Sequence, residues 1–227
     1  GSVMCKETVT LLDENGQPAA SVVAKSPEGK EIGTFIVDKE TGLVTFTPTD
    51  KSYSGEVVPV KVQAKDANGT PAETSYTPKI TPVVPTSEDA TTTDIQGATQ
   101  TGKPEFKGGT VTVDGVGKTV PINEAVPATF DDGSTTKTVD GVGTYTVAAD
   151  GTVTFVPEKS FTGKAPAVTV VREDKNGTKA SATYTPTVTP VTPTAEDTTS
   201  TDKQGQTQTG TPTFTPGNPN VPMDDDT

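Results

Sequence analysis

The sequence lacks histidine and tryptophan altogether, and Cys5 is its only cysteine. A single cysteine cannot form a disulfide within the chain, and Cys/His zinc sites need several such ligands. Without histidine, the commonest general base and the usual activator of a serine nucleophile are missing. The composition therefore excludes disulfide scaffolds, zinc modules and histidine-dependent hydrolases.

Apolar residues are scarce, since hydrophobic residues make up 30% of the chain and aromatic residues 5%. Such a chain builds a thin core, mainly from Val, Thr and a few Phe or Tyr. No apolar run approaches the roughly 20 residues that a membrane helix requires. We expect a modestly stable protein without a membrane span, and a largely disordered stalk is the alternative that this composition leaves open.

Positive charge is also in short supply, because 18 Lys and Arg stand against 30 Asp and Glu, for a formal net charge of −12. This balance disfavours nucleic acid and anionic lipid surfaces as partners. It is typical of a solvated, self-repelling surface. We expect no nucleic acid, no membrane and no cofactor to be bound.

The sequence does contain a long internal repeat. The text YTPKITPVVPTSEDATTTDIQGATQTG at Tyr76–Gly102 returns at Tyr184–Gly210 as YTPTVTPVTPTAEDTTSTDKQGQTQTG, 108 residues later. Upstream, Gly33–Thr70 aligns with Gly143–Thr178 when small gaps are allowed. A repeat of this length is a whole domain, because solenoid and propeller units run about 20–50 residues.

Two ways of dividing the chain fit this repeat. We favour modules at 5–126 and 127–227, because this division leaves no partial module over. The alternative places the boundaries near 85 and 193 and leaves a third piece at the end.

Short alternating segments predict strands. GLVTFTP at 42–48 and GTVTFVP at 151–157 place β-branched and aromatic residues at period two, and Val-rich runs lie at 57–64, 144–147 and 167–171. Runs of this kind bounded by Gly, Pro, Asn and Asp indicate half-buried strands, and no segment shows a helical apolar period. The sequence predicts an all-β fold with two tandem antiparallel β-sandwich (Ig-like) modules arranged end to end.

Turns and core plugs can be placed as well. Asn68-Gly69 and Asn176-Gly177 tolerate the positive φ of a tight hairpin. Tyr53 and Phe161 occupy one aligned position after a strand, where we expect them to close one end of each core.

The proline-rich segments carry a separate expectation. Thr77–Thr86 and Thr185–Thr194 should form edge strands or extended crossovers rather than central strands, because proline donates no backbone hydrogen bond. After each of them, Phe106 and Phe214 should return an aromatic side chain to the core.

Calcium is the serious site hypothesis. Two DxNG turns begin like an EF-hand loop but lack its closing Glu, and acidic runs lie near the predicted module joint. A hairpin turn plus an exposed acidic loop is the simpler interpretation, so we assign no metal site and keep these residues as weak candidates: Asp66, Asn68, Asp174, Asn176, Asp224, Asp225 and Asp226.

Other chemistry has little support. No GxSxG motif occurs, and the Glu88-Asp89 and Glu196-Asp197 pairs have no neighbouring aromatic residue to stack a sugar. Lys51 and Lys159 are matched candidates for isopeptide cross-links, but the available Asn residues suit turns better. We expect no enzyme activity and assign no catalytic residue.

Several motifs taken together resemble the CshA-type fibril repeat. They are YTPTVTPVTPT, the QGxTQTGxPxF segment, GTYTVAADGTVTFVP, SFTGK and DKNGT, and the likeness is close over Phe130–Phe214 and weaker before Gly33. That family forms the stalks of wall-anchored fibrillar adhesins on streptococci and related Gram-positive bacteria. The text VTFTP…SYSG…KDANGT is more loosely similar to bacterial cadherin-like and Ig-like tandem domains.

The resemblance implies stalk repeats that project an N-terminal adhesive region from the bacterial cell wall. In such proteins, ligand binding, including fibronectin binding, belongs to the non-repeat region. We therefore expect an extracellular monomer that is anchored through a C-terminal region absent here, with neighbouring repeats as partners and no direct host ligand. A repeat that itself binds a host glycoprotein or a partner cell, or a calcium-rigidified cadherin-like module, is the alternative.

Overall fold

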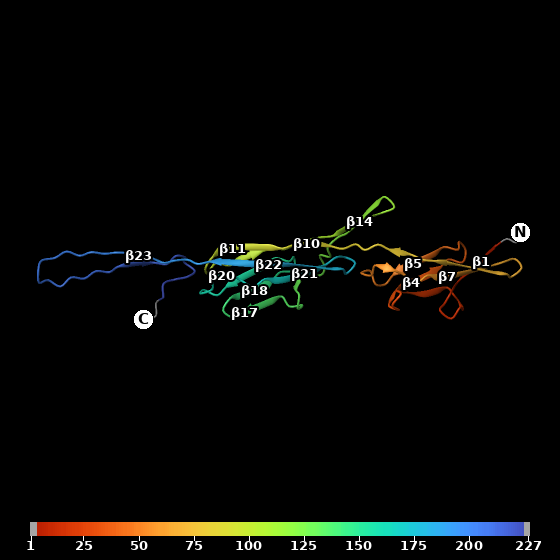
Figure 1. Cartoon of the computed structure of the whole chain (residues 1–227), viewed down its shortest axis with the longest axis horizontal. Coiled ribbons are helices and arrows are strands. Elements are labelled where there is room, and N and C mark those ends of the chain that lie inside the picture. The colour runs from red at the N-terminus through yellow and green to blue at the C-terminus, as the bar shows by residue number, and fades with distance from the viewer. Residues whose placement is uncertain (1–3, 225–227) are drawn as a thin grey trace. The chain divides into compact units, whose positions relative to one another are not determined.

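The computed structural model describes residues 4–224, and the side chains from residue 9 onward (Figure 1). Strands, turns and extended segments account for all of this range, and the described residues contain no helix. The all-β prediction is confirmed. The chain divides into two compact units. Unit 1 comprises 4–84, 109–120 and 175–178, and unit 2 comprises 85–108, 121–174 and 179–224.

Unit 1 is built from two small sheets. One has the order β2-β1-β7-β8 and the other β3-β4-β5, with a two-stranded β6-β9 pair beside them. Their bounds are β1 Met4–Leu12, β2 Pro18–Ala19, β3 Ser21–Lys25, β4 Glu31–Val37, β5 Val44–Pro48, β6 Gly55–Glu56, β7 Val60–Asp66, β8 Pro71–Tyr76 and β9 Lys79–Ile80. The core between the sheets consists of Leu11, Ala24, Ile32, Phe35, Val37, Val57 and Val60.

Unit 2 also packs two sheets face to face. The five-stranded sheet has the order β11-β22-β21-β16, with β20 pairing to β22, and the four-stranded sheet has the order β12-β19-β18-β17. Their bounds are β11 Ala90–Ile95, β12 Gln100–Gly102, β16 Thr129–Phe130, β17 Thr136–Val139, β18 Gly143–Val147, β19 Val153–Pro157, β20 Gly163–Lys164, β21 Val168–Glu173 and β22 Lys179–Thr189.

The core of unit 2 is larger than that of unit 1. It is formed by Ala128, Phe130, Tyr145, Val147, Val153, Phe155, Ala165, Val168, Val170, Tyr184 and Val188. These residues alternate along β18, β19, β21 and β22, as half-buried strands require. Tyr53 packs against the core of unit 1 and Phe161 against that of unit 2, which confirms the plug prediction.

The two units repeat one pairing scheme. Val60 lies opposite Tyr76 in unit 1, and Val168 lies opposite Tyr184 in unit 2. The other sheets agree too, because Gly33 opposes Pro48 as Gly143 opposes Pro157. The sequence repeat is therefore a repeat of strand register and not only of composition.

Three further pairs complete the described strands. Hairpin β14–β15 turns through Asp114 and Gly115, which both have positive φ, as a tight Asp-Gly hairpin demands. The pairs β10–β13 and β23–β24 form separate two-stranded sheets. The bounds are β10 Thr86–Glu88, β13 Glu105–Lys107, β14 Gly109–Val113, β15 Val116–Val120, β23 Thr194–Glu196 and β24 Thr213–Thr215.

One strand differs from its prediction. The expectation that Thr185–Thr194 could not enter a central strand is wrong, because β22 continues to Thr189 between β21 and β11. β22 stays continuous through Pro186 because β11 pairs with it across this position, where Thr92 lies opposite Pro186. On the other side of β22, the residues that pair with β21 end at Tyr184 and those that pair with β20 begin at Thr187, so the missing N–H of Pro186 interrupts neither of those ladders. In unit 1 the equivalent segment does break, into β8 and β9.

Candidate functional site

The segment that follows unit 1 along the chain completes the sandwich of unit 2. We call Thr86–Lys107 the inner string and Thr194–Thr215 the outer string, since the two are copies 108 residues apart. Within the inner string, β11 pairs in parallel with β22, and β12 pairs antiparallel with β19. β22 and β19 belong to different sheets, so the inner string adds an edge strand to each of them (Figure 1 shows β11 beside β22).

A buried hydrogen-bond chain fixes the inner string in place. Gln100 is 4% exposed, and its amide nitrogen donates to the Thr187 carbonyl at 3.0 Å. The Thr92 hydroxyl donates to the Gln100 side-chain oxygen at 2.6 Å and also shares a hydrogen bond with the Tyr184 hydroxyl. Because Thr92 has a single hydroxyl proton, Tyr184 is the donor in that second bond. The side chains of Thr92, Gln100 and Tyr184 therefore all have hydrogen-bond partners, as buried polar groups require.

The Tyr184 ring lies flat against Gly102. A Cβ added to Gly102 would meet ring atoms of Tyr184 at 2.1 and 2.6 Å, so only glycine fits at this position. Burial raises the pKa of Tyr184 above its ordinary value. Burial likewise raises the pKa of the neighbouring Tyr145 to about 12. Both phenols are therefore held neutral in the core.

The outer string has the same internal structure but no sheet to pair with among the described residues. Strands β23 and β24 pair with Thr194 opposite Thr215, the register in which β10 and β13 place Thr86 opposite Lys107. The Ser200 hydroxyl donates to the Gln208 side-chain oxygen at 2.7 Å, as Thr92 does to Gln100.

The outer string is nevertheless exposed along its length. Phe214 is 62% exposed, whereas Phe106, its counterpart, packs against the core of unit 2. The prediction that both aromatic side chains return to a core is confirmed for Phe106 and wrong for Phe214. The reason is that the outer string lacks the paired sheet edges against which the inner string places Phe106.

The calcium candidates are spread over several turns. The Asp66 carboxylate accepts backbone N–H bonds from Asn68 and Thr70, each at 2.9 Å, which is the geometry of a hairpin turn. Asp174 is fully buried and precedes the second turn, in which Asn176 lies. Asp224 is exposed, and Asp225 and Asp226 lie outside the described residues. No group of three potential metal ligands gathers in the range that the structure describes.

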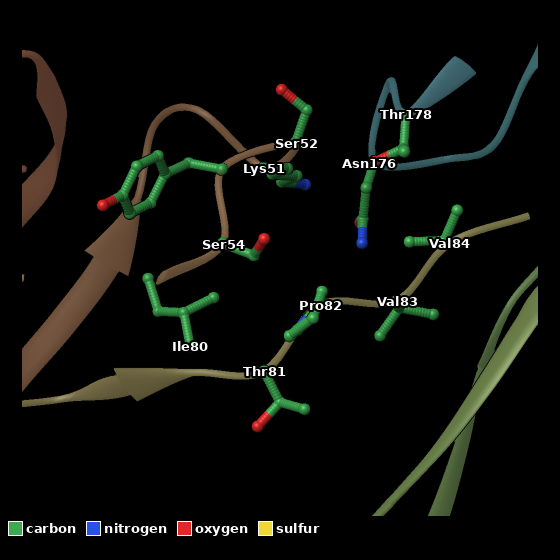
Figure 2. A pocket seen from close by; sticks show the side chains of 11 residues that line it. Lys51, Ser52, Ser54, Ile80, Thr81, Pro82, Val83, Val84, Asn176 and Thr178 are labelled. Atoms are coloured by element: carbon green, nitrogen blue, oxygen red, sulfur yellow. The ribbon is translucent and has the colours of Figure 1, made fainter. Parts of the chain in front are cut away.

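Unit 1 has two hollows. In one, the turn that carries Lys51, Ser52 and Ser54 lies opposite the extended segment Ile80–Val84 (Figure 2). The other has a volume of about 720 Å³ and lies beside β1, β3 and β7, with Glu14 and Lys25 among its lining residues.

Sequence reasoning missed the residues that hold the inner string: Gln100, Thr92, Gly102 and Tyr184. The sequence repeat was the available signal, because Gln100 and Gly102 recur as Gln208 and Gly210, Thr92 recurs as the hydroxyl residue Ser200, and Tyr184 repeats Tyr76. The text alone does not show that one copy is buried and the other exposed.

With this geometry established, the comparisons with known proteins are decisive. The family described as the surface adhesin CshA repetitive domain matches the chain at residues 2–80, 82–188 and 190–227. The chain belongs to the CshA repeat family. Membership supports the role of a repeat of a surface adhesin at the cell surface.

Solved structures give one similar repeat at high identity. Repeat domain 13 of the fibrillar adhesin CshA from Streptococcus gordonii is 61% identical, over 30% of this chain and 86% of that one, with a TM-score of 0.19. Drosophila N-cadherin EC1-3 is 19% identical over 69% of this chain and 51% of that one, with a TM-score of 0.28. Mouse cadherin-23 EC22-24 is 13% identical over 81% and 53%, also at 0.28.

No protein of curated function is matched. Within the described residues of this CshA repeat chain, no helix is long and apolar enough to cross a membrane.

Proposed function

We propose that this chain consists of stalk repeats of a fibrillar adhesin, which stack in series and hold an adhesive region away from the cell wall. The observation that carries the proposal is the duplicated register, because two similarly folded bodies in one chain add length without adding a new site. Membership in the adhesin repeat family supports the same function. Wall anchoring and an end-to-end arrangement of the modules belong to this proposal.

The pairing of the inner string bears on the module boundaries. Because β11 and β12 pair only within unit 2, the pattern favours boundaries near 85 and 193 over modules at 5–126 and 127–227. We therefore propose a repeat that begins with its string and ends with the counterpart of β22. The division remains a prediction that limited proteolysis at the two boundaries would test.

The surface supports a stalk rather than a ligand-binding module. With no tryptophan and aromatic residues at 5% of the chain, the sequence is poor in the residues that dominate binding interfaces. Like-charged neighbours repel each other, which favours a monomer and limits sticking between fibrils on a crowded surface.

Length is the property to measure. Arrays of two, four and six such repeats, imaged by electron microscopy, should lengthen by a constant increment per repeat. The 227-residue chain should also have a radius of gyration clearly above the value of about 17 Å expected for one compact body of this size. Arrays that grow as globular particles would contradict the stalk proposal.

A further inference from the structure

Unit 1 has an open edge where unit 2 is closed by the inner string. In the part of the chain that the structure describes, β5 pairs only with β4, and β8 pairs only with β7. Their counterparts in unit 2, β19 and β22, each carry a further strand, β12 and β11. The same edge of the same fold is therefore paired in one unit and unpaired in the other.

The open edge leaves apolar groups exposed in unit 1. Tyr76 is 37% exposed, whereas Tyr184, its counterpart, is fully buried. Phe46 is only half-buried, although its counterpart Phe155 is fully buried. These are the two aromatic side chains that the inner string covers in unit 2, where Gly102 lies against the Tyr184 ring and Gln100 pairs with Phe155.

The strand of unit 1 that corresponds to β22 is broken in two. β22 is continuous from Lys179 to Thr189, and β11 pairs with it across Tyr184–Thr189. The corresponding stretch of unit 1 is interrupted at Thr77-Pro78, between β8 and β9. A partner strand supplies the hydrogen bonds that keep an irregular, proline-containing strand in line, so its absence accounts for the break.

We propose that the open edge of unit 1 is an acceptor for a string that precedes unit 1 in the same polypeptide, and that every folded body of the stalk is completed in this way by the string ahead of it. Unit 2 displays the completed form, with its string entering directly from the residues that follow unit 1. This rests on the proposed stalk function only in requiring that repeats follow one another.

The outer string is the donor in its unbound form. Its β23–β24 pair, its Ser200–Gln208 hydrogen bond and its Gln206 to Lys203 turn bond match the inner string position by position, yet its side chains are exposed. The donor is thus shaped before it binds, which lowers the ordering cost of docking. The hydrogen-bonding groups of an open edge favour addition of a strand.

The side chains that make the contacts recur in the outer string. Asp89 accepts the Thr183 N–H at 2.7 Å, and Asp197 occupies its position. Gln100 recurs as Gln208 and Gly102 as Gly210. On the acceptor side, Tyr76 repeats Tyr184. Tyr76 can therefore receive the glycine of a string ahead of unit 1, and Gly210 can contact the equivalent tyrosine of a body that follows the outer string.

The test extends the full chain with a copy of residues 85–120 joined ahead of Gly1. Hydrogen exchange is followed in Val44–Pro48 and in Pro71–Ile80. We expect the added string to slow exchange at both edges by at least about tenfold, because a tether supplies an effective concentration in the millimolar range. A matched extension carries valine in place of the glycine equivalent to Gly102 and should leave exchange unchanged.

Protection that appears with the native extension and not with the valine extension supports the acceptor. No protection, or equal protection with both extensions, would overturn it. In the unextended chain, protection that rises with protein concentration and disappears in Gly210→Val would assign the edge to a second copy and overturn the preceding string of the same polypeptide as occupant. The length increments of repeat arrays test the stalk separately, so either proposal can fail alone.

Discussion

At the residue scale, the behaviour of each string depends on a few small or polar side chains. Gly102 allows the backbone to approach the Tyr184 ring, and Gln100 satisfies a backbone carbonyl that would otherwise be buried without a donor. The equivalent residues of the outer string, Gly210 and Gln208, are exposed. The molecule therefore provides an internal control for each substitution.

Gly102→Val should destabilise unit 2. The added side chain would overlap the Tyr184 ring, and overpacking of this kind costs about 1–3 kcal/mol in the free energy of unfolding. Urea unfolding of the full chain measures the loss. The matched variant Gly210→Val should unfold like the parent chain, because its string is exposed and its nearest neighbour is the Thr198 methyl group at 3.1 Å. Equal losses in the two variants would contradict the account.

Gln100→Ala should lower the free energy of unfolding of unit 2 by about 1–3 kcal/mol, since it leaves the Thr187 carbonyl and the Thr92 hydroxyl without their partner. Gln208→Ala should change it by less than about 0.5 kcal/mol, the usual range for an exposed site. Denaturant unfolding of both variants provides the comparison. A neutral Gln100→Ala would show that this hydrogen-bond chain does not hold the string.

At the scale of the elements, much of the fold could be predicted from the sequence. Alternation located β5, β18, β19 and β21 because each has one buried face, and the Asn-Gly pairs located the turns. The parallel pairing of β11 with β22 could not be predicted, because it joins Ala90 to Tyr184, far along the chain. Thr-rich text without a buried apolar stripe carries no signal for such a pairing.

Alkaline pH should weaken unit 2. The pKa of Tyr145 is raised to about 12 in the folded state and the pKa of Tyr184 is raised as well, so their neutral forms add stability that is complete below the ordinary value of 10.0 and is lost as the pH rises through the raised values. Ionised Tyr184 also cannot donate to Thr92. Thermal unfolding across this range should show a falling midpoint, and Tyr184→Phe should reduce the slope. A flat profile would contradict the buried, neutral phenols.

Calcium should leave stability unchanged. The Asp66 carboxylate is already engaged by two backbone N–H groups of its own turn, and no three-ligand cluster gathers among the described residues. We therefore expect equal melting temperatures in millimolar calcium and in EDTA. A melting temperature that is higher in calcium than in EDTA, with a difference that Asp66→Asn abolishes, would instead support the cadherin-like alternative.

At the scale of the whole molecule, the chain contains two copies of the string, one paired with sheets and one exposed. The inner string is paired into the sandwich of unit 2 and the outer string is exposed, although most of their residues are the same. A stalk built from such repeats would gain stability in each repeat, because each folded body depends in part on the string that precedes it.

Hydrogen exchange of the unmodified chain tests this claim most directly. The amides of Thr91–Ile95 and Gln100–Gly102 should exchange slowly, at rates near those of β22, while the matching amides at 199–203 and 208–210 exchange within the shortest labelling time. Comparable exchange in the two strings, whether both fast or both slow, would contradict the account.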